Sequence, residues 1–218
     1  MIESQRIAAE GEQEPTQDAE LAVVEEPEYF GRIRQWASDR NLINGSDSKS
    51  QFLKLQSEKG ELAEAIRLGN RDEIIDGIGD ASVVLTIIAA QNGIEITNDV
   101  IQEEVSYING IVERSQGFVY SFLSLDAQIG RLGDAIAKGQ DVNAPIMKSI
   151  LELQFLAQMY HVQMGVEAAK SYAFALENAW NDIKDRKGVM YNGVFVKSTD
   201  ERYESIVAEL AAAQKNTD

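Results

Sequence analysis

Four acidic residues form two closely spaced pairs in the first half of the chain, and this spacing suits metal-dependent chemistry. Glu58 and Glu61 are three residues apart, whereas Asp76 and Asp80 are four apart. Either spacing puts both members of a pair on one face of a helix. Carboxylate oxygens without His or Cys partners are typical ligands of Mg²⁺, so we predict a magnesium cage, with Mn²⁺ as the alternative ion. Considered alone, Glu58 and Glu61 would also suit a solvated helix surface.

The surroundings of the second pair favour the metal site. Asp76 and Asp80 lie in an otherwise apolar segment, and no Lys or Arg occurs in it over residues 74–92. A buried carboxylate is costly unless a cation compensates its charge. Gly77 and Gly79 narrow the same segment, which predicts that a ligand approaches its backbone closely.

Two antiparallel helices would position these acids. Apolar residues recur at helical spacing over about 48–68 and 72–92, and Gly69-Asn70 marks a turn between these segments. A short connection makes neighbouring helices antiparallel. Glu58 lies about three turns before the turn and Asp80 about three turns after it, so we expect them at one level of a helical bundle.

The second half of the chain repeats this plan. The aligned positions are Phe122-Leu123 on Phe52-Leu53, Leu125 on Leu55, Gly130 on Gly60, Leu132 on Leu62, Gly139 on Gly69 and, after a two-residue insertion, Gly165 on Gly93. Shared core positions and shared helix-ending glycines indicate a tandem duplication of a helical unit. Two amphipathic hairpins that merely look alike are the alternative.

The charged residues divide between the two halves. The alignment replaces the acids Glu58, Glu61, Asp76 and Asp80 by Gln128, Arg131, Lys148 and Glu152. A cationic group, Asn181-x-x-Lys184-x-Arg186-Lys187, ends the second half, whereas the first half has Val112 at the position of Lys184. This division predicts one site that is shared between the halves. The alternative is that the cations only stabilise a helix C-terminus.

Composition excludes several other classes of protein. The 218 residues include no Cys and one His, and the net charge is −16. Disulfides, Cys-based zinc sites and a Ser–His triad are therefore excluded or disfavoured. An acidic surface repels nucleic acid, and no apolar run is long enough to span a membrane. The N-terminus is polar and acidic, so we expect a cytoplasmic protein.

These observations predict an all-α helical bundle of two tandem repeats with a short C-terminal β-hairpin. The hairpin is predicted around Asn192-Gly193, and further helices are predicted over about 97–115 and 199–213. The predicted units are a disordered acidic tail (1–28), a first repeat with the acids (29–116), a second repeat with the cationic group and the hairpin (117–197), and a C-terminal helix and tail (198–218).

The motifs together resemble the all-α NTP pyrophosphatases, the MazG-like group that also includes dimeric dUTPases. The resemblance lies in 36–42, Glu58-Lys59-Gly60-Glu61-Leu62, 76–80, 179–188 and 193–197, and agreement is fullest with the short MazG-like proteins often carried by phages. The family has Glu-x-x-Glu on one helix and Glu-x-x-Asp on the next.

This chain departs from the family pattern at one position. Gly77 replaces the family's second-helix Glu, and Asp76 and Glu73 are the nearest acids. Asp76 lies on the same helix face as Asp80, so we nominate Asp76 as the fourth ligand.

The resemblance implies a Mg²⁺-dependent nucleoside triphosphate pyrophosphohydrolase, which converts a (d)NTP and water to a (d)NMP and pyrophosphate. We expect a deoxynucleotide as the preferred substrate, since many of the resembling proteins clean nucleotide pools. The resemblance implies metal binding by Glu58, Glu61 and Asp80, with Asp76 nominated beside them, and triphosphate binding by Asn181, Lys184, Arg186 and Lys187. We further predict catalysis by Glu61 and Glu58. Gln51 and Lys54 precede the Glu pair on the same helix and are predicted to contact phosphate or base, with a surface lysine as the alternative for Lys54. We expect neither nucleic acid nor a membrane as partner, and a homodimer stays open. The rival hypothesis is a helical nucleotide-binding or regulatory protein with weak or no catalysis.

Overall fold

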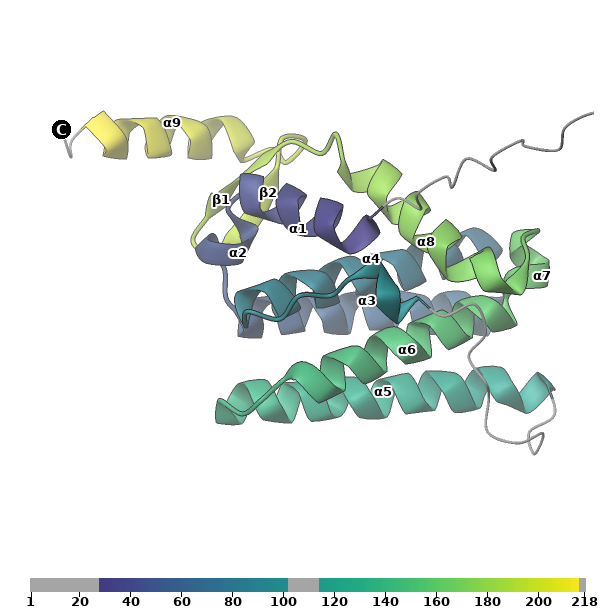
Figure 1. Cartoon of the computed structure of the whole chain (residues 1–218). Helices are drawn as coiled ribbons and strands as arrows, with labels where there is room; N and C mark the ends of the chain where they lie inside the picture. The colour runs from purple at the N-terminus through teal and green to yellow at the C-terminus, as the bar shows by residue number, and fades with distance from the viewer. Residues whose placement is uncertain (1–27, 102–113, 216–218) are drawn as a thin grey trace, which may run out of the picture.

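The computed structural model describes residues 28–101 and 114–215 (Figure 1). The described residues form a mostly helical protein with one two-stranded antiparallel hairpin, which confirms the predicted all-α class. The elements are α1 (Tyr29–Asp39), α2 (Leu42–Gly45), α3 (Ser48–Leu68), α4 (Arg71–Gln91), η1 (Asn98–Val100), α5 (Arg114–Lys138), α6 (Asn143–Met159), α7 (His161–Met164), α8 (Ala168–Ile183), β1 (Gly188–Tyr191), β2 (Val194–Lys197) and α9 (Tyr203–Lys215). In these residues no helix is both long and apolar enough to cross a membrane.

Two helical hairpins, α3–α4 and α5–α6, form the core of the bundle. Helix α8 packs on α4 and α6. Helices α1 and α2 also pack on α4, and α1 contacts α8 as well (Figure 1). The fully buried side chains of the core come from both hairpins, for example Leu55, Leu62, Leu125 and Leu132. The apolar spacing of the sequence therefore correctly predicts which helix faces are buried.

The predicted helix-ending glycines have matching conformations in the two halves. Gly69 and Gly139 have φ angles of 66° and 62°, and the residue after each donates its backbone N–H to a carbonyl five residues earlier. Gly93 and Gly165 both have φ of 70°. Left-handed glycines of this kind satisfy the last carbonyls of a helix. The matching ends agree with the alignment, while the duplication itself stays a prediction.

The prediction of an α-helix over 97–115 is wrong at its beginning. Asn98–Val100 is a single 3₁₀ turn, and Ile101 is extended. The Asn98 side chain accepts a hydrogen bond from the backbone N–H of Tyr29 at 3.2 Å, so this segment caps the start of α1 instead of extending a helix of its own. Residues 102–113 lie outside the described residues, as does nearly all of the predicted tail 1–28.

The predicted role of the two glycines in α4 is also wrong. A Cβ atom at Gly77 would lie 3.0 Å from the Cβ of Leu62 on α3, and one at Gly79 would lie 2.7 Å from the carbonyl oxygen of Ala175 and from the Cβ of Ala179 on α8. The glycines thus let two helices approach α4 closely, and they do not open its backbone to a ligand.

Replacing Gly79 by Ala should destabilise the protein by about 1–3 kcal/mol, because the added methyl group meets the backbone of α8. The measurement is the free energy of unfolding in urea. Gly130→Ala is the matched control, since Gly130 is also helical and a Cβ there meets no atom within 4 Å. That control should gain up to about 1 kcal/mol from helix propensity. Equal effects of both substitutions would contradict this account of the α4–α8 contact.

The predicted hairpin is confirmed. Asn192 and Gly193 have φ angles of 50° and 79°, as a two-residue hairpin turn requires, and Tyr191 pairs with Val194. A second, smaller core cluster lies beneath it and joins α1, α2, α4 and α8, with Trp36, Leu42, Val83 and Ile183 among its buried members. Residues of this cluster and of the hairpin lie next to Glu58 on α3 and Asp80 on α4.

Candidate functional site

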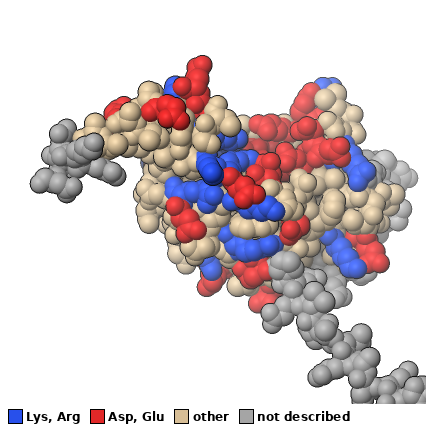
Figure 2. Space-filling model, turned by 90° about the horizontal axis from the view of Figure 1, so that it is seen from above, with Lys and Arg blue, Asp and Glu red and all other residues tan. Residues whose placement is uncertain are grey.

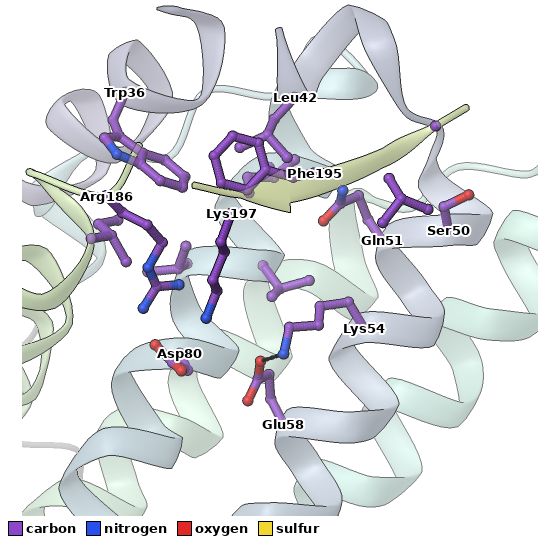
Figure 3. A pocket seen from close by; sticks show the side chains of 16 residues that line it. Trp36, Leu42, Ser50, Gln51, Lys54, Glu58, Asp80, Arg186, Phe195 and Lys197 are labelled. Atoms are coloured by element: carbon purple, nitrogen blue, oxygen red, sulfur yellow. Dashed lines mark ion pairs between the residues drawn. The ribbon is translucent and has the colours of Figure 1, made fainter. Parts of the chain in front are cut away.

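A cavity of about 230 Å³ lies where α3, α4, the end of α8 and the hairpin meet (Figure 3). Glu58 of α3 and Asp80 of α4 lie at its floor. Three cationic side chains, Lys54, Arg186 and Lys197, line it as well. Its apolar wall is formed by Trp36, Leu42, Val83, Val84, Ile87, Ile183, Val194 and Phe195. The cavity thus combines two carboxylates, three cations and an apolar wall.

The two carboxylates lie on the same cavity floor, one from each helix of the α3–α4 hairpin, so the predicted common level of Glu58 and Asp80 is confirmed. Glu58 is almost completely buried, with 2% of the residue exposed, and its carboxylate forms an ion pair with Lys54. Burial, together with the carboxylates of Glu58 and Asp76, raises the pKa of Asp80 to about 7, although the Arg186 charge acts in the opposite direction. Carboxylates that repel each other in a buried place favour a bound cation or a proton.

Asp76 lies near the same group of charges. Its pKa is raised first by burial and then by the carboxylates of Asp182, Glu73 and Glu58, and Arg186 lowers it. Asp182, on α8, is an acid that sequence reasoning missed. It follows Asn181 directly in the cationic motif, so the motif itself was the signal that could have drawn attention to it.

Glu61 lies elsewhere. It is exposed, accepts a hydrogen bond from the Ser57 hydroxyl at 3.2 Å, and lines a separate surface hollow together with Glu73. In the described parts of the chain, no group of three or more His, Asp or Glu side chains is arranged as it stands to hold a metal ion. The structure therefore brings Glu58 and Asp80 together, with Asp76 in electrostatic reach, and does not bring Glu61 to the cavity.

The four residues of the cationic motif do not all reach the cavity. Arg186 lines the cavity and pairs with Asp182 one turn earlier. The other three members, Asn181, Lys184 and Lys187, are exposed and are not among the described residues that line the cavity. The Lys184 ammonium group instead donates to the Asn181 side-chain oxygen at 2.7 Å.

A second arginine fixes the end of α8. The Arg40 guanidinium donates to the backbone carbonyl of Arg186 at 2.8 Å and to that of Lys184 at 3.2 Å. It also lies over the Trp36 ring, 4.9 Å from its centroid. Cations that bind the last carbonyls of a helix stabilise that helix end. Arg40 therefore holds the segment from which Arg186 enters the cavity.

Sequence reasoning missed Lys197 as a site residue. It ends β2, and its side chain extends down toward the acids (Figure 3). Antiparallel pairing with Gly188 sets the position of Lys197, because the two residues are opposite each other in the register. The predicted hairpin was the available signal, but the direction of its last side chain depends on how the hairpin lies on the bundle.

The predicted residue Gln51 lines the cavity and is 8% exposed. Its side-chain amide donates to the Ser46 hydroxyl at 2.9 Å, and Gln91 donates to the same oxygen at 3.0 Å. Gln51 thus belongs to a hydrogen-bonded wall between α2, α3 and α4. This arrangement fixes the side of the cavity opposite Arg186.

Positive charge is concentrated locally although the whole chain is acidic. Figure 2 shows Lys and Arg side chains gathered in a band near the middle of one face, directly beside Asp and Glu side chains. The cavity is lined by cations from both halves, Lys54 from the first and Arg186 and Lys197 from the second. Its floor acids both come from the first half. An anionic ligand can therefore find cations here despite the net charge of −16.

Comparison with known proteins identifies no family. No model of a protein family matches the chain, and no solved structure matches it. A 63-residue stretch is 48% identical to an uncharacterized 18.2 kDa protein of the rep-hol intergenic region of Haemophilus phage HP1. That match covers 29% of this chain and 39% of the phage protein, so the chain spans about two fifths of the length of this relative.

Proposed function

We propose that this protein is a Mg²⁺-dependent nucleoside triphosphate pyrophosphohydrolase, which releases a nucleoside monophosphate and pyrophosphate, with a deoxynucleotide as preferred substrate. One observation carries the proposal: buried carboxylates, cations and an apolar wall line a single cavity. A nucleotide complexed with a metal ion presents the matching chemistry, since it combines a divalent cation, phosphate oxygens and a flat apolar base.

The donor set suits a hard divalent cation. Glu58 and Asp80 offer carboxylate oxygens at the floor, and burial, followed by the neighbouring carboxylates, raises the pKa of both Asp76 and Asp80. Oxygen-only donors favour Mg²⁺ or Mn²⁺. When bound, such an ion neutralises phosphate charge and makes the phosphorus more open to attack by water. Glu58, Asp80 and Asp76 would hold it, and Glu61 stays a prediction from the resemblance.

The chain's own cations would bind the phosphate groups. Arg186 can offer a guanidinium fork to phosphate oxygens, and Lys197 can add a point charge from the hairpin. Both lie across the cavity from the floor acids (Figure 3). Trp36 and Phe195, whose ring centroids are 6.2 Å apart, offer apolar surface that would exclude water and contact the base.

The test is to incubate the full chain with each dNTP and NTP and Mg²⁺, and to identify the products. We expect a monophosphate and pyrophosphate in equal amounts, and we expect no reaction when EDTA removes the metal. Release of inorganic phosphate without pyrophosphate would contradict the proposed bond cleavage. We place the activity in the cytoplasm, of the host cell if the chain is phage-encoded, where the nucleotide pools are.

A second candidate function is nucleotide binding without turnover. The observation in its favour is that the described acids do not form a ready cluster of three, with Glu61 outside the cavity. Calorimetry with Mg²⁺ and a non-hydrolysable dNTP separates the two functions. Tight binding together with no product after long incubation of the ordinary dNTP would favour the binding protein.

A further inference from the structure

The cavity contains an ion pair whose two members differ sharply in exposure. The Lys54 ammonium group pairs with the Glu58 carboxylate one turn further along α3 (Figure 3). The Glu58 side chain is 3% exposed, whereas the Lys54 side chain is 57% exposed. The acid is therefore fixed in the bundle, and its cation reaches it from solvent on a flexible stem that can move away.

The ion pair compensates the buried acids only in part. Lys54 is paired with the Glu58 carboxylate, while the second acid, Asp80, lines the same cavity floor. One ammonium group carries a single charge and approaches the pair of acids from the side of α3. A divalent cation between Glu58 and Asp80 would interact with both carboxylates. Its electrostatic attraction to Glu58 would therefore be stronger than that of the Lys54 ammonium group.

In the second half, both positions of the ion pair hold uncharged residues. The alignment places Ser124 at the position of Lys54 and Gln128 at that of Glu58. Ser124 donates its hydroxyl to Glu152, the counterpart of Asp80, at 2.5 Å, and Gln128 is buried, with 9% of the residue exposed. The lysine is thus absent where the buried acid is absent. This is the pattern expected if the lysine serves that acid.

We propose that Lys54 is the internal counter-ion of Glu58 and that a divalent cation displaces it, so that metal loading frees the ammonium group to face the anionic ligand. The inference rests on the proposed function, because it takes Glu58 as a metal ligand. It makes metal binding a cation exchange. Lys54 stabilises the buried acid in the metal-free chain, and it becomes a phosphate-binding cation once the metal is in place.

The exchange links stability to metal affinity. If Lys54 leaves Glu58 when metal binds, Lys54→Met should destabilise the metal-free protein and should have no effect on the metal-loaded one. The closed thermodynamic cycle then requires tighter metal binding by the variant, by the same factor as its loss of metal-free stability. We expect about a tenfold gain in Mn²⁺ affinity at low salt, since the pair is exposed on one side.

The experiment measures urea unfolding and Mn²⁺ binding of the full chain, without nucleotide, for the wild type and Lys54→Met. Lys49→Met is the matched control, because Lys49 is an exposed lysine on the same helix and does not line the cavity. It should leave both quantities unchanged. Lys54→Arg keeps the charge and should restore the metal-free stability. In the background of Glu58→Gln, Lys54→Met should have no effect on either quantity.

A direct measurement on the wild type covers the case in which Lys54→Met does not fold. The ¹⁵N resonance of the Lys54 ammonium group should shift during a Mg²⁺ titration, along the same curve as calorimetric binding. Wild-type metal binding with an unchanged Lys54 resonance, or a stability gap that persists at saturating Mn²⁺, overturns the counter-ion role alone. No binding of Mn²⁺ or Mg²⁺ by the wild type overturns both this role and the metal site of the proposed function.

Discussion

Asp80→Asn should abolish hydrolysis and at the same time stabilise the metal-free protein at neutral pH. Asp80 lines the cavity floor opposite Glu58, so loss of its charge removes a metal ligand and should lower kcat by a factor of about 10² or more. The same charge is unfavourable for folding without metal, because burial and the neighbouring carboxylates raise the pKa of Asp80 to about 7. Activity and stability should therefore change in opposite directions.

The raised pKa of Asp80 determines how the free energy of unfolding changes with pH. A carboxyl group with a folded-state pKa of about 7 binds its proton more tightly in the folded chain than in the unfolded chain, where the value is 3.8. The resulting stability is fully present below about pH 4 and is lost as pH rises through 7. Asp80→Asn should remove this loss and raise the free energy of unfolding at pH 8 by about 2–4 kcal/mol, with little change at pH 4.

Urea unfolding of metal-free protein at pH 4 and pH 8, beside dNTP hydrolysis at saturating Mg²⁺, measures both effects. Asp134→Asn is the control, since Asp134 is an exposed acid of α5 that pairs with Lys138. This control should keep its activity and change stability by less than about 0.5 kcal/mol. Wild-type turnover by Asp80→Asn would show that the cavity floor is not the metal site.

The sequence predicts the helices well where the signal is local. The bounds 48–68 and 72–92 agree with α3 and α4 to within one residue, because a continuous apolar stripe ends at a turn with a left-handed glycine, Gly69. Prediction from the local pattern fails where a contact with a residue far away in the sequence determines the conformation. Asn98 caps α1, 69 residues earlier in the chain, and thereby interrupts a segment that has helical apolar spacing.

The site is predictable only in part for the same reason. Spacing correctly pairs Glu58 with Asp80, since the turn between α3 and α4 fixes their level. It does not distinguish Glu58 from Glu61, because residues three apart on a helix differ by about 60° in direction. That difference is enough to bury Glu58 and expose Glu61 at the edge of the same face. Asp182 and Lys197 come from the distant end of the chain, and only the fold shows that they reach these acids.

Arg186→Ala should reduce hydrolysis far more than Lys184→Ala, although the resemblance implies substrate binding by both residues. Arg186 lines the cavity and lowers the pKa of both Asp76 and Asp80, so it is near the floor acids. Its removal should lower kcat/KM by a factor of about 10²–10³, as for a charge-assisted contact to phosphate in a closed site. Lys184 is exposed and bound to Asn181, and its removal should cost less than about threefold.

Steady-state kinetics with the best dNTP at saturating Mg²⁺ measures this difference, with helix content checked by circular dichroism. Lys138→Ala is the second control, because Lys138 is an exposed lysine at the end of α5 that pairs only locally, with Asp134. Arg186→Ala has a further signature that a lost structural contact would not give. Without the Arg186 charge, the pKa of Asp76 and Asp80 should rise, so the acid limb of the pH–rate profile should move to higher pH. Equal losses from Arg186→Ala and Lys184→Ala, with an unmoved acid limb, would mean that the phosphate groups bind outside this cavity.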